Sequence, residues 1–276
     1  MPKSESDAEI LHKVPFCKGL SECTLVMDVM HIIDCHIHCG VQNVSQPFED
    51  IEPLLNSAGI DGACLYAPVE DIYYRYSSHF NDNETWRKCR ANAHDYLLEI
   101  SREKDQIYPY YFVWNDFIVE DLEKEIFGIK WHHHAGEPPY NYTDPKCTEM
   151  IDAICSRNLP IVLEETFRQT LKFIEQVAGR TPVIIPHLGL LNGGFDRLLN
   201  AGIWNDDNIY GDTALAGKYE ISSFLDTYGY NRLIFGSDYP FGMPGSQLDQ
   251  IKNMGIADKD LAKICGKNIL KLLKIS

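Results

Sequence analysis

The segment Ile32-Ile33-Asp34-Cys35-His36-Ile37-His38 is the most informative stretch of the chain. Side chains alternate along a strand, so we expect His36 and His38 to project from one face together with Asp34. Two neutral imidazoles about 7 Å apart on such a face can bind one ion. The alternative is a pair of core histidines with hydrogen-bonded partners. The place of the pair at the end of a first strand favours the metal, because barrel active sites form there.

Apolar, β-branched or aromatic runs recur along the rest of the chain. Together with His31–His38 they make eight candidate strands, the others being Gly62–Ala67, Ile107–Trp114, Phe127–His132, Pro160–Glu164, Pro182–His187, Asn208–Thr213 and Arg232–Asp238. Segments with helical periodicity lie between them, namely Trp86–Glu103, Cys147–Arg157, Thr170–Ala178, Tyr219–Tyr228 and Leu248–Asn253. Strands that alternate with helices predict an α/β protein with a parallel sheet, and eight such units predict a (β/α)8 TIM barrel.

We therefore expect a single barrel domain over residues 30–276, preceded by an N-terminal extension of unknown role at residues 1–29. A doubly wound open sheet is the competing fold. It lacks support, because the sequence contains neither a G-x-G-x-x-G segment after the first strand nor a Walker A motif.

Composition excludes several classes of protein. The 276 residues carry a net charge of −15, which argues against a nucleic-acid partner and offers no basic patch for a membrane. The polar start lacks the apolar stretch of a signal peptide, and no run approaches the roughly 20 apolar residues of a membrane span. The nine cysteines are scattered without a C-x-x-C pair. We expect a cytoplasmic protein that acts on a small molecule.

Two later strand ends carry polar residues of the kind that bind metals. His187 ends the run Val183–Pro186, and Asp238 follows Leu233–Ser237. A buried charge is costly unless it is paired or bound to a metal, so Asp238 is expected to have a partner at the barrel mouth. A structural salt bridge is the alternative.

The order of these motifs resembles that of the amidohydrolase superfamily, in the branch that includes the aminocarboxymuconate-semialdehyde decarboxylase group. The resemblance covers residues 31–276 and depends on Asp34-x-His36-x-His38, Gly128–His132, His187-Leu188-Gly189, Gly236–Pro240 and Gly266–Leu273. It implies that His36, His38 and Asp238 bind a divalent metal ion and that Asp238 also handles a proton. It further implies that His187 joins the ligands or polarises the substrate, and that His132 lines the pocket.

Glu164 departs from the family pattern. The resemblance implies a ligand histidine after the fifth strand, whereas this chain has Pro160-Ile161-Val162-Leu163-Glu164-Glu165-Thr166. Either the site has lost a ligand, or the Glu164 carboxylate replaces the imidazole. With Glu164 as a ligand we expect one ion, Zn²⁺ first, with Mn²⁺ or Fe²⁺ as alternatives because carboxylates suit harder ions. Some superfamily members carbamylate a strand-four lysine to bridge two metals, and Lys130 lies near that position while Glu164 could also bridge. The resemblance is to a branch that uses one metal, so a two-metal site is the alternative.

Substrate contacts are less well defined by the sequence. In the run His132-His133-His134, at most His132 and His134 share a face, and we expect one histidine to line the pocket while the others are solvated in a loop. Arg75 and Arg168 follow the second and fifth strands, where a guanidinium can hold a substrate carboxylate, and Tyr239 is assigned to the same role. A surface position is the alternative for either arginine.

These features predict metal-dependent hydrolysis of an amide, lactone or ester. Asp238 would accept the proton of the attacking water, and His187 and His132 would stabilise the oxyanion. Non-oxidative decarboxylation of an aromatic or dienoic acid needs nearly the same residues, and an arginine in the pocket beside a planar slot would favour it. A third alternative is a non-catalytic barrel, favoured if Glu164 points away from His36 and His38. The sequence is also compatible with a homodimer, which barrels of this kind often form.

Overall fold

The computed structural model of the chain describes residues 30–41 and 46–275. The predicted N-terminal extension, residues 1–29, lies outside the described residues. No helix within the described ranges is both long and apolar enough to cross a bilayer. The described cysteines, seven in all, are free thiols.

The predicted barrel is confirmed. Eight strands form one sheet in the order β1 to β8, and every neighbouring pair is parallel. Each strand lies inside one of the predicted runs, as β1 (Ile33–His38), β2 (Gly62–Tyr66), β3 (Ile107–Phe112), β4 (Gly128–His132), β5 (Ile161–Glu164), β6 (Val183–Ile185), β7 (Ile209–Asp212) and β8 (Leu233–Ile234).

The barrel closes between β1 and the segment that continues β8. The Cys35 amide donates to the Phe235 carbonyl at 3.0 Å, and the Asp238 amide donates to the His36 carbonyl at 2.8 Å. The His38 amide then donates to the Tyr239 carbonyl at 2.9 Å. The chain after β8 therefore runs beside β1 as far as the carboxyl end, which brings Asp238 next to the histidine pair.

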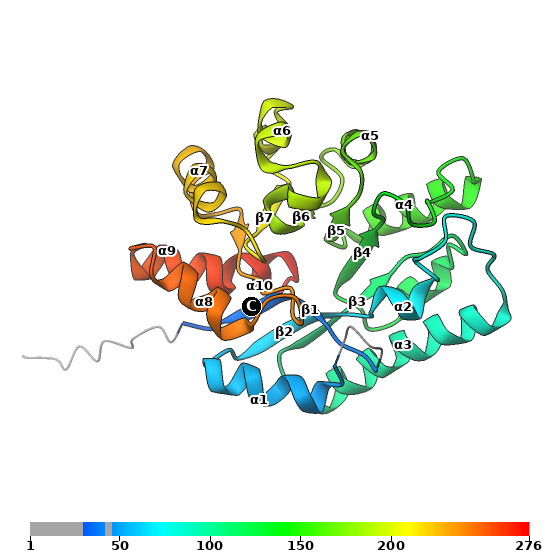
Figure 1. Cartoon of the computed structure of the whole chain (residues 1–276), viewed down its shortest axis with the longest axis horizontal. Coiled ribbons are helices and arrows are strands. Elements are labelled where there is room, and N and C mark those ends of the chain that lie inside the picture. Colours follow the sequence, from blue (N-terminus) through cyan, green and yellow to red (C-terminus); the bar gives the residue numbers. More distant parts are fainter. Residues whose placement is uncertain (1–29, 42–45, 276) are drawn as a thin grey trace, which may run out of the picture.

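Helices surround the strands (Figure 1). The α-helices are α1 (Phe48–Ala58), α2 (Val69–Ile72), α3 (Glu84–Glu103), α4 (Pro145–Arg157), α5 (Phe167–Val177), α6 (Phe195–Asn200), α7 (Lys218–Tyr228), α8 (Pro244–Lys252), α9 (Asp258–Ala262) and α10 (Asn268–Leu272). Shorter turns complete the fold, namely the 3₁₀ segments η1 (Val119–Glu123), η2 (Pro186–Asn192) and η3 (Ile203–Asn205) and the π segment η4 (Lys263–Lys267).

Amphipathic spacing explains how the helices cover the barrel. In α5, Thr170, Phe173, Ile174 and Val177 are buried, which is the i, i+3, i+4, i+7 stripe of a helix packed on one side. The outer hydrophobic core lies between such stripes and the outward faces of the strands.

A second, inner core fills the barrel. It contains side chains such as Cys35, Tyr66 and Tyr110 from the strands together with Ile269 and Leu272 of α10. The helix α10 is anchored at the amino ends of the strands, where Asn268 Nδ2 donates to the Leu233 carbonyl at 2.8 Å. The interior is thus closed at the amino end, and its functional side chains gather at the carboxyl end.

An irregularity in β1 sets the direction of its histidines. Asp34 pairs with Ala63 but Ile37 pairs with Leu65, so β1 has one extra residue relative to β2. Such a β-bulge interrupts the alternation of side chains. The expectation that Asp34 joins the two histidines is wrong for this reason. Its Oδ1 instead accepts hydrogen bonds from the backbone amides of His36, at 3.1 Å, and Ser237, at 2.9 Å.

Candidate metal centre

A cavity opens at the carboxyl ends of the strands, as expected for a barrel enzyme. Its volume is about 250 Å³, below the roughly 300–1,000 Å³ of most ligand pockets, so a ligand held there is small. Its titratable side chains include six at or shortly after the carboxyl ends of five strands, namely His38, His132, His134, Glu164, His187 and Asp238. Glu70 and Arg75 join them from α2 and the segment after it.

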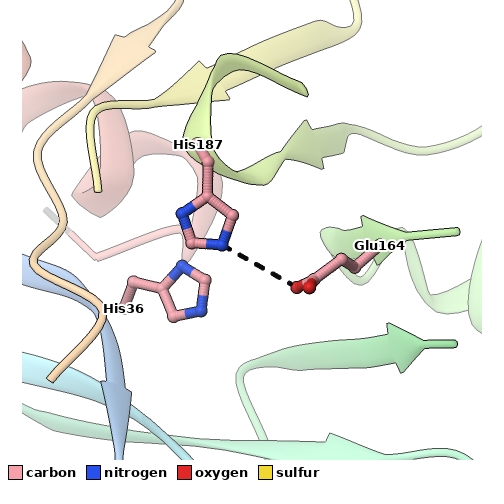
Figure 2. A group of neighbouring side chains, drawn as sticks. All are labelled: His36, Glu164 and His187. Carbon is pink, nitrogen blue, oxygen red and sulfur yellow. Dashed lines mark ion pairs between the residues drawn. The ribbon is translucent and has the colours of Figure 1, made fainter. Parts of the chain in front are cut away.

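Five of the predicted residues converge on one place. Asp238 Oδ1 lies 3.1 Å from His38 Nε2 and 3.4 Å from His36 Nε2. His187 Nε2 lies 3.9 Å from Asp238 Oδ2 and 4.0 Å from Glu164 Oε2. The rings of His36 and His187 stack at 5.0 Å, with the Glu164 carboxylate opposite them (Figure 2). The ligand atoms lie within 4.8 Å of one another in each of two groups that share His36. One group is His36, His38 and Asp238, and the other is His36, Glu164 and His187.

The hydrogen bonds of the histidines fix where their lone pairs lie. His187 Nδ1 is 2.9 Å from the Ala214 carbonyl oxygen, which can only accept, so this nitrogen carries the hydrogen. In the neutral ring Nε2 then presents a lone pair toward the carboxylates of Glu164 and Asp238. His36 has the same arrangement, with Nδ1 donating to Asp212 Oδ2 at 2.9 Å. Lone pairs and carboxylates that face one space match the donors that a divalent cation requires, so these residues fit a metal ion.

Lys130 adds a positive charge beneath this group. Its buried Nζ lies 3.1 Å from Glu164 Oε2, 3.3 Å from His36 Nε2 and 5.1 Å from the centre of the Tyr66 ring. Burial alone would raise the pKa of the Glu164 carboxyl, but Lys130 and His132 hold it well below its usual range. Glu164 is therefore ionised and points into the centre.

His36 and Asp238 have protonation states that suit a divalent ion. Burial lowers the pKa of His36 well below its ordinary value, and Lys130 adds to the effect, so this imidazole stays neutral. Burial opposes ionisation of Asp238, yet His36 and His38 hold its pKa below the usual range. A neutral imidazole and an ionised carboxylate are the forms that bind divalent ions.

Left-handed backbone conformations place two of these side chains. His187 has φ 57° and ψ 26°, and Asp238 has φ 60°. Residues other than glycine rarely adopt this region, and its strain of roughly 1–3 kcal/mol is found mainly at functional sites. The Asp212 carboxylate stabilises the turn by accepting the His187 amide at 2.7 Å.

A second group of polar side chains adjoins Glu164. His132 Nε2 lies 3.4 Å from Glu164 Oε1, and His134 Nε2 contacts the same oxygen. His133 is turned away and binds Glu165 Oε2 at 2.9 Å. His132 and His134 thus share a face as predicted. The expectation that the other two histidines are solvated in a loop is wrong, because His134 lines the cavity and His133 is buried.

A family model described as Amidohydrolase (Amidohydro_2) matches residues 33–275, almost the whole described barrel. This chain belongs to the amidohydrolase family. A comparison with curated proteins found no match.

Solved structures resemble this amidohydrolase at low identity, and they show the fold. A 2,6-dihydroxybenzoate decarboxylase complexed with 2,6-dihydroxybenzoate has a TM-score of 0.71 at 14% identity, over 89% of this chain and 99% of its own. The 5-carboxyvanillate decarboxylase of Sphingomonas paucimobilis has a TM-score of 0.69 at 12% identity, over 90% and 100%. A probable 2-pyrone-4,6-dicarboxylic acid hydrolase of Acinetobacter baumannii has 0.65 at 14% identity, over 89% and 100%.

The predicted substrate-binding residues of this amidohydrolase lie in different places. Arg75 lines the cavity and pairs with Glu137 at 2.5 Å and Glu70 at 3.2 Å. Arg168 is exposed on the first turn of α5 and does not line the cavity. Tyr239 belongs to the outer hydrophobic core and does not line the cavity. Of the three, only Arg75 is placed to contact a ligand in this cavity.

Sequence reasoning missed several residues around the centre of this amidohydrolase. Asp212 ends a strand, as Asp238 follows one, and that position was a usable signal. Glu137 and Tyr73 carried no signal, because loops after β4 and β2 bring them to His132. The sequence suggests only carbamylation as a role for Lys130, whereas its side chain forms a buried ion pair with Glu164.

Proposed function

We propose that this amidohydrolase uses a divalent ion at His36, His38, Glu164 and Asp238, with His187 as a further ligand, to hydrolyse an amide, lactone or ester bond of a small molecule. One observation carries the proposal. The His187 Nε2 lone pair, the Glu164 carboxylate and the Asp238 carboxylate face one space at the floor of the cavity. The hydrogen bond from His187 Nδ1 favours a ligand role for His187 among the two roles that the resemblance offers.

A divalent ion bound here would polarise the substrate carbonyl and lower the pKa of the attacking water. Asp238 is ionised, borders the cavity and accepts the proton of that water, which it then returns to the leaving group. The sequence expectation that His187 and His132 stabilise an oxyanion is not favoured, because Nδ1 of His187 contacts the Ala214 carbonyl oxygen and Nδ1 of His132 contacts the Tyr73 hydroxyl. A ring that carries its single hydrogen on Nδ1 has no hydrogen on Nε2 to donate. Arg75 is the guanidinium in the cavity wall and supplies donors to an anionic group of the substrate.

Decarboxylation remains the second candidate, and the position of Arg75 supports it. A guanidinium in the wall of a small cavity suits a carboxylated substrate. The similar structures include decarboxylases of dihydroxybenzoate and carboxyvanillate as well as a probable pyrone dicarboxylic acid hydrolase, whose substrates are all carboxylated rings. We therefore propose a small carboxylated ring as the substrate class for either reaction. The non-catalytic alternative loses its support because Glu164 points toward the centre.

Zinc is the metal we propose first, with Mn²⁺ or Fe²⁺ as alternatives. The centre offers two carboxylates besides its imidazoles, which shifts preference toward harder ions, and one similar structure is described with bound manganese. Because this donor set suits zinc as well as harder ions, we propose that the metal content is mixed, and metal analysis of an untagged preparation that gave clean stoichiometric zinc would count against it. We propose a cytoplasmic location, which the free thiols of the seven described cysteines support.

The test of the function combines metal loading with a substrate screen. The untagged protein, stripped and then reloaded with Zn²⁺ or Mn²⁺, is incubated with carboxylated aromatics, lactones and amides. Hydrolysis releases a new acid, whereas decarboxylation releases CO₂, so the two candidates give different products. Asp238→Asn should abolish turnover, and His133→Ala, at a side chain turned away from the cavity, is the matched control. A protein that binds neither ion and gains no thermal stability from them would refute the proposal.

A further inference from the structure

We propose that His132, His134 and Glu164 bind a second divalent ion, and that Glu164 bridges it to the ion of the first group. The inference rests on the proposed function for that first ion. The ligand atoms of these three residues lie within 4.8 Å of one another. All three line the cavity, and the His134 side chain is 27% exposed, so an ion can reach them from solvent.

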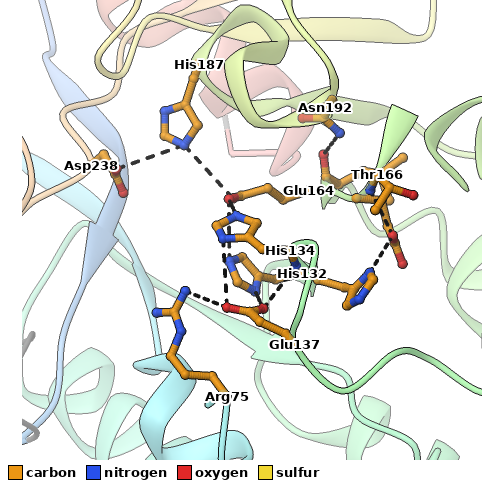
Figure 3. A network of polar contacts seen from close by, with 12 residues as sticks. Arg75, His132, His134, Glu137, Glu164, Thr166, His187, Asn192 and Asp238 are labelled. Atoms are coloured by element: carbon orange, nitrogen blue, oxygen red, sulfur yellow. Dashed lines mark hydrogen bonds and ion pairs between the residues drawn. The ribbon is translucent and has the colours of Figure 1, made fainter. Parts of the chain in front are cut away.

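The Glu164 carboxylate divides its two oxygens between two groups of residues. Oε2 faces Lys130 at 3.1 Å and His187 at 4.0 Å, on the side of the first group. Oε1 faces His132 at 3.4 Å and contacts His134, on the other side. Figure 3 shows Glu164 between His187 and this second histidine pair. A carboxylate with one oxygen toward each of two ligand groups has the arrangement of a bridging ligand in two-metal sites.

The hydrogen bonding of His132 calls for a cation on this side. The Tyr73 hydroxyl donates to Glu137 Oε2 at 2.8 Å, so it accepts from His132 Nδ1 at 3.2 Å. The Nε2 lone pair of the neutral ring is then directed at Glu164 Oε1. Two acceptors that face each other at 3.4 Å repel, and a bound cation between them replaces that repulsion with two favourable contacts.

A carboxylate also lies behind each ring, as it does behind His36. Glu137 Oε2 lies 3.7 Å from His132 Nδ1, and Glu137 Oε1 lies 3.8 Å from His134 Nδ1. Metal-binding histidines commonly have a carboxylate at the nitrogen opposite the metal, where it orients the ring and raises its basicity. Arg75 holds Glu137 in this position. The second group therefore has both the ligands and the supporting residues of a metal site.

The competing explanation is that His134 carries a hydrogen on Nε2 and simply donates it to Glu164. The number of metal ions bound per chain distinguishes a second metal site from a simple hydrogen bond between His134 and Glu164. Untagged protein is stripped with chelator, loaded to saturation with Mn²⁺, and assayed for bound metal per chain and by electron paramagnetic resonance. We expect two ions per chain and the signal of a spin-coupled pair in the wild type. His134→Ala should retain one ion with an uncoupled signal, and His133→Ala should retain two.

The outcomes also separate this inference from the proposed function. One uncoupled ion per chain in the wild type, or two ions retained by His134→Ala, would overturn the second site and leave the first intact. No bound ion at all would overturn both. Circular dichroism checks that each variant is folded. If His134→Ala is unfolded, His134→Gln keeps a hydrogen-bond donor for Glu164 while removing the imidazole, and the same loss of one ion is expected.

Discussion

The buried pair of Lys130 and Glu164 makes a quantitative prediction. Lys130 is fully buried and Glu164 is 3% exposed, with Nζ and Oε2 at 3.1 Å. In Glu164→Gln the side chain keeps its shape but loses its charge, which leaves the ammonium uncompensated. Breaking a buried pair from one side costs roughly 3–5 kcal/mol. For a domain of this size each kcal/mol corresponds to about 2–4 °C, so the metal-free variant should melt roughly 6–20 °C below the wild type.

Calorimetry in excess EDTA measures this effect on four proteins, namely the wild type, Glu164→Gln, Lys130→Met and the double variant. Removing both partners leaves no lone charge, so the double variant should recover most of the loss. Glu165→Gln is the matched control, since Glu165 is equally buried but is bound by His133 and Tyr142 without a lysine. The melting temperature of Glu165→Gln should fall less than that of Glu164→Gln. Two results would refute the reasoning. One is a melting temperature for Glu164→Gln that differs from the wild type by no more than about 2 °C, roughly the error of the method. The other is a double variant whose loss of stability equals the sum of the losses of the two single variants.

Three further predictions concern His94, Asp212 and Gly62. Burial lowers the pKa of His94 from 6.5 to about 3, so the folded protein favours the neutral imidazole. The resulting contribution to the free energy of unfolding is fully present above about pH 6.5, and roughly 4–5 kcal/mol of it is lost as the pH falls toward 3. Urea titrations of His94→Gln should therefore show a weaker loss of stability in acid. Asp212→Asn weakens the acceptor of His36 Nδ1 and should lower metal affinity about 10–100-fold in a chelator competition. Gly62→Ala would place a Cβ 2.2 Å from the Gln106 carbonyl oxygen and should cost about 1–3 kcal/mol, measured as a lower melting temperature.

The strands were predictable because their signals are local. Apolar runs, helical periodicity and polar residues at strand ends are visible in the sequence, and parallel strands bring those ends together. His36, His38, His187 and Asp238 meet for that reason. Glu164 was identified by its position in the fifth run, and the structure places it among them.

The remaining features depend on contacts between distant segments. The bulge in β1 arises from its pairing with β2 on one side and with the segment after β8 on the other, which no single stretch encodes. The pairing of Lys130 with Glu164 and the approach of Glu137 to His132 depend on the register of the strands and on the path of a loop. Such contacts span about 5 to 200 positions in the chain and are fixed only when the barrel closes.

Because α10 closes the interior, the two ends of the barrel differ. The cavity opens at the carboxyl ends of the strands, whereas α10 and Ile275 lie at the amino ends. A support-bound form of the protein, tethered at α10, would present every copy with its cavity outward. Libraries that vary the cavity loops would in turn leave the anchoring end untouched, so that immobilisation chemistry and substrate range can be engineered independently.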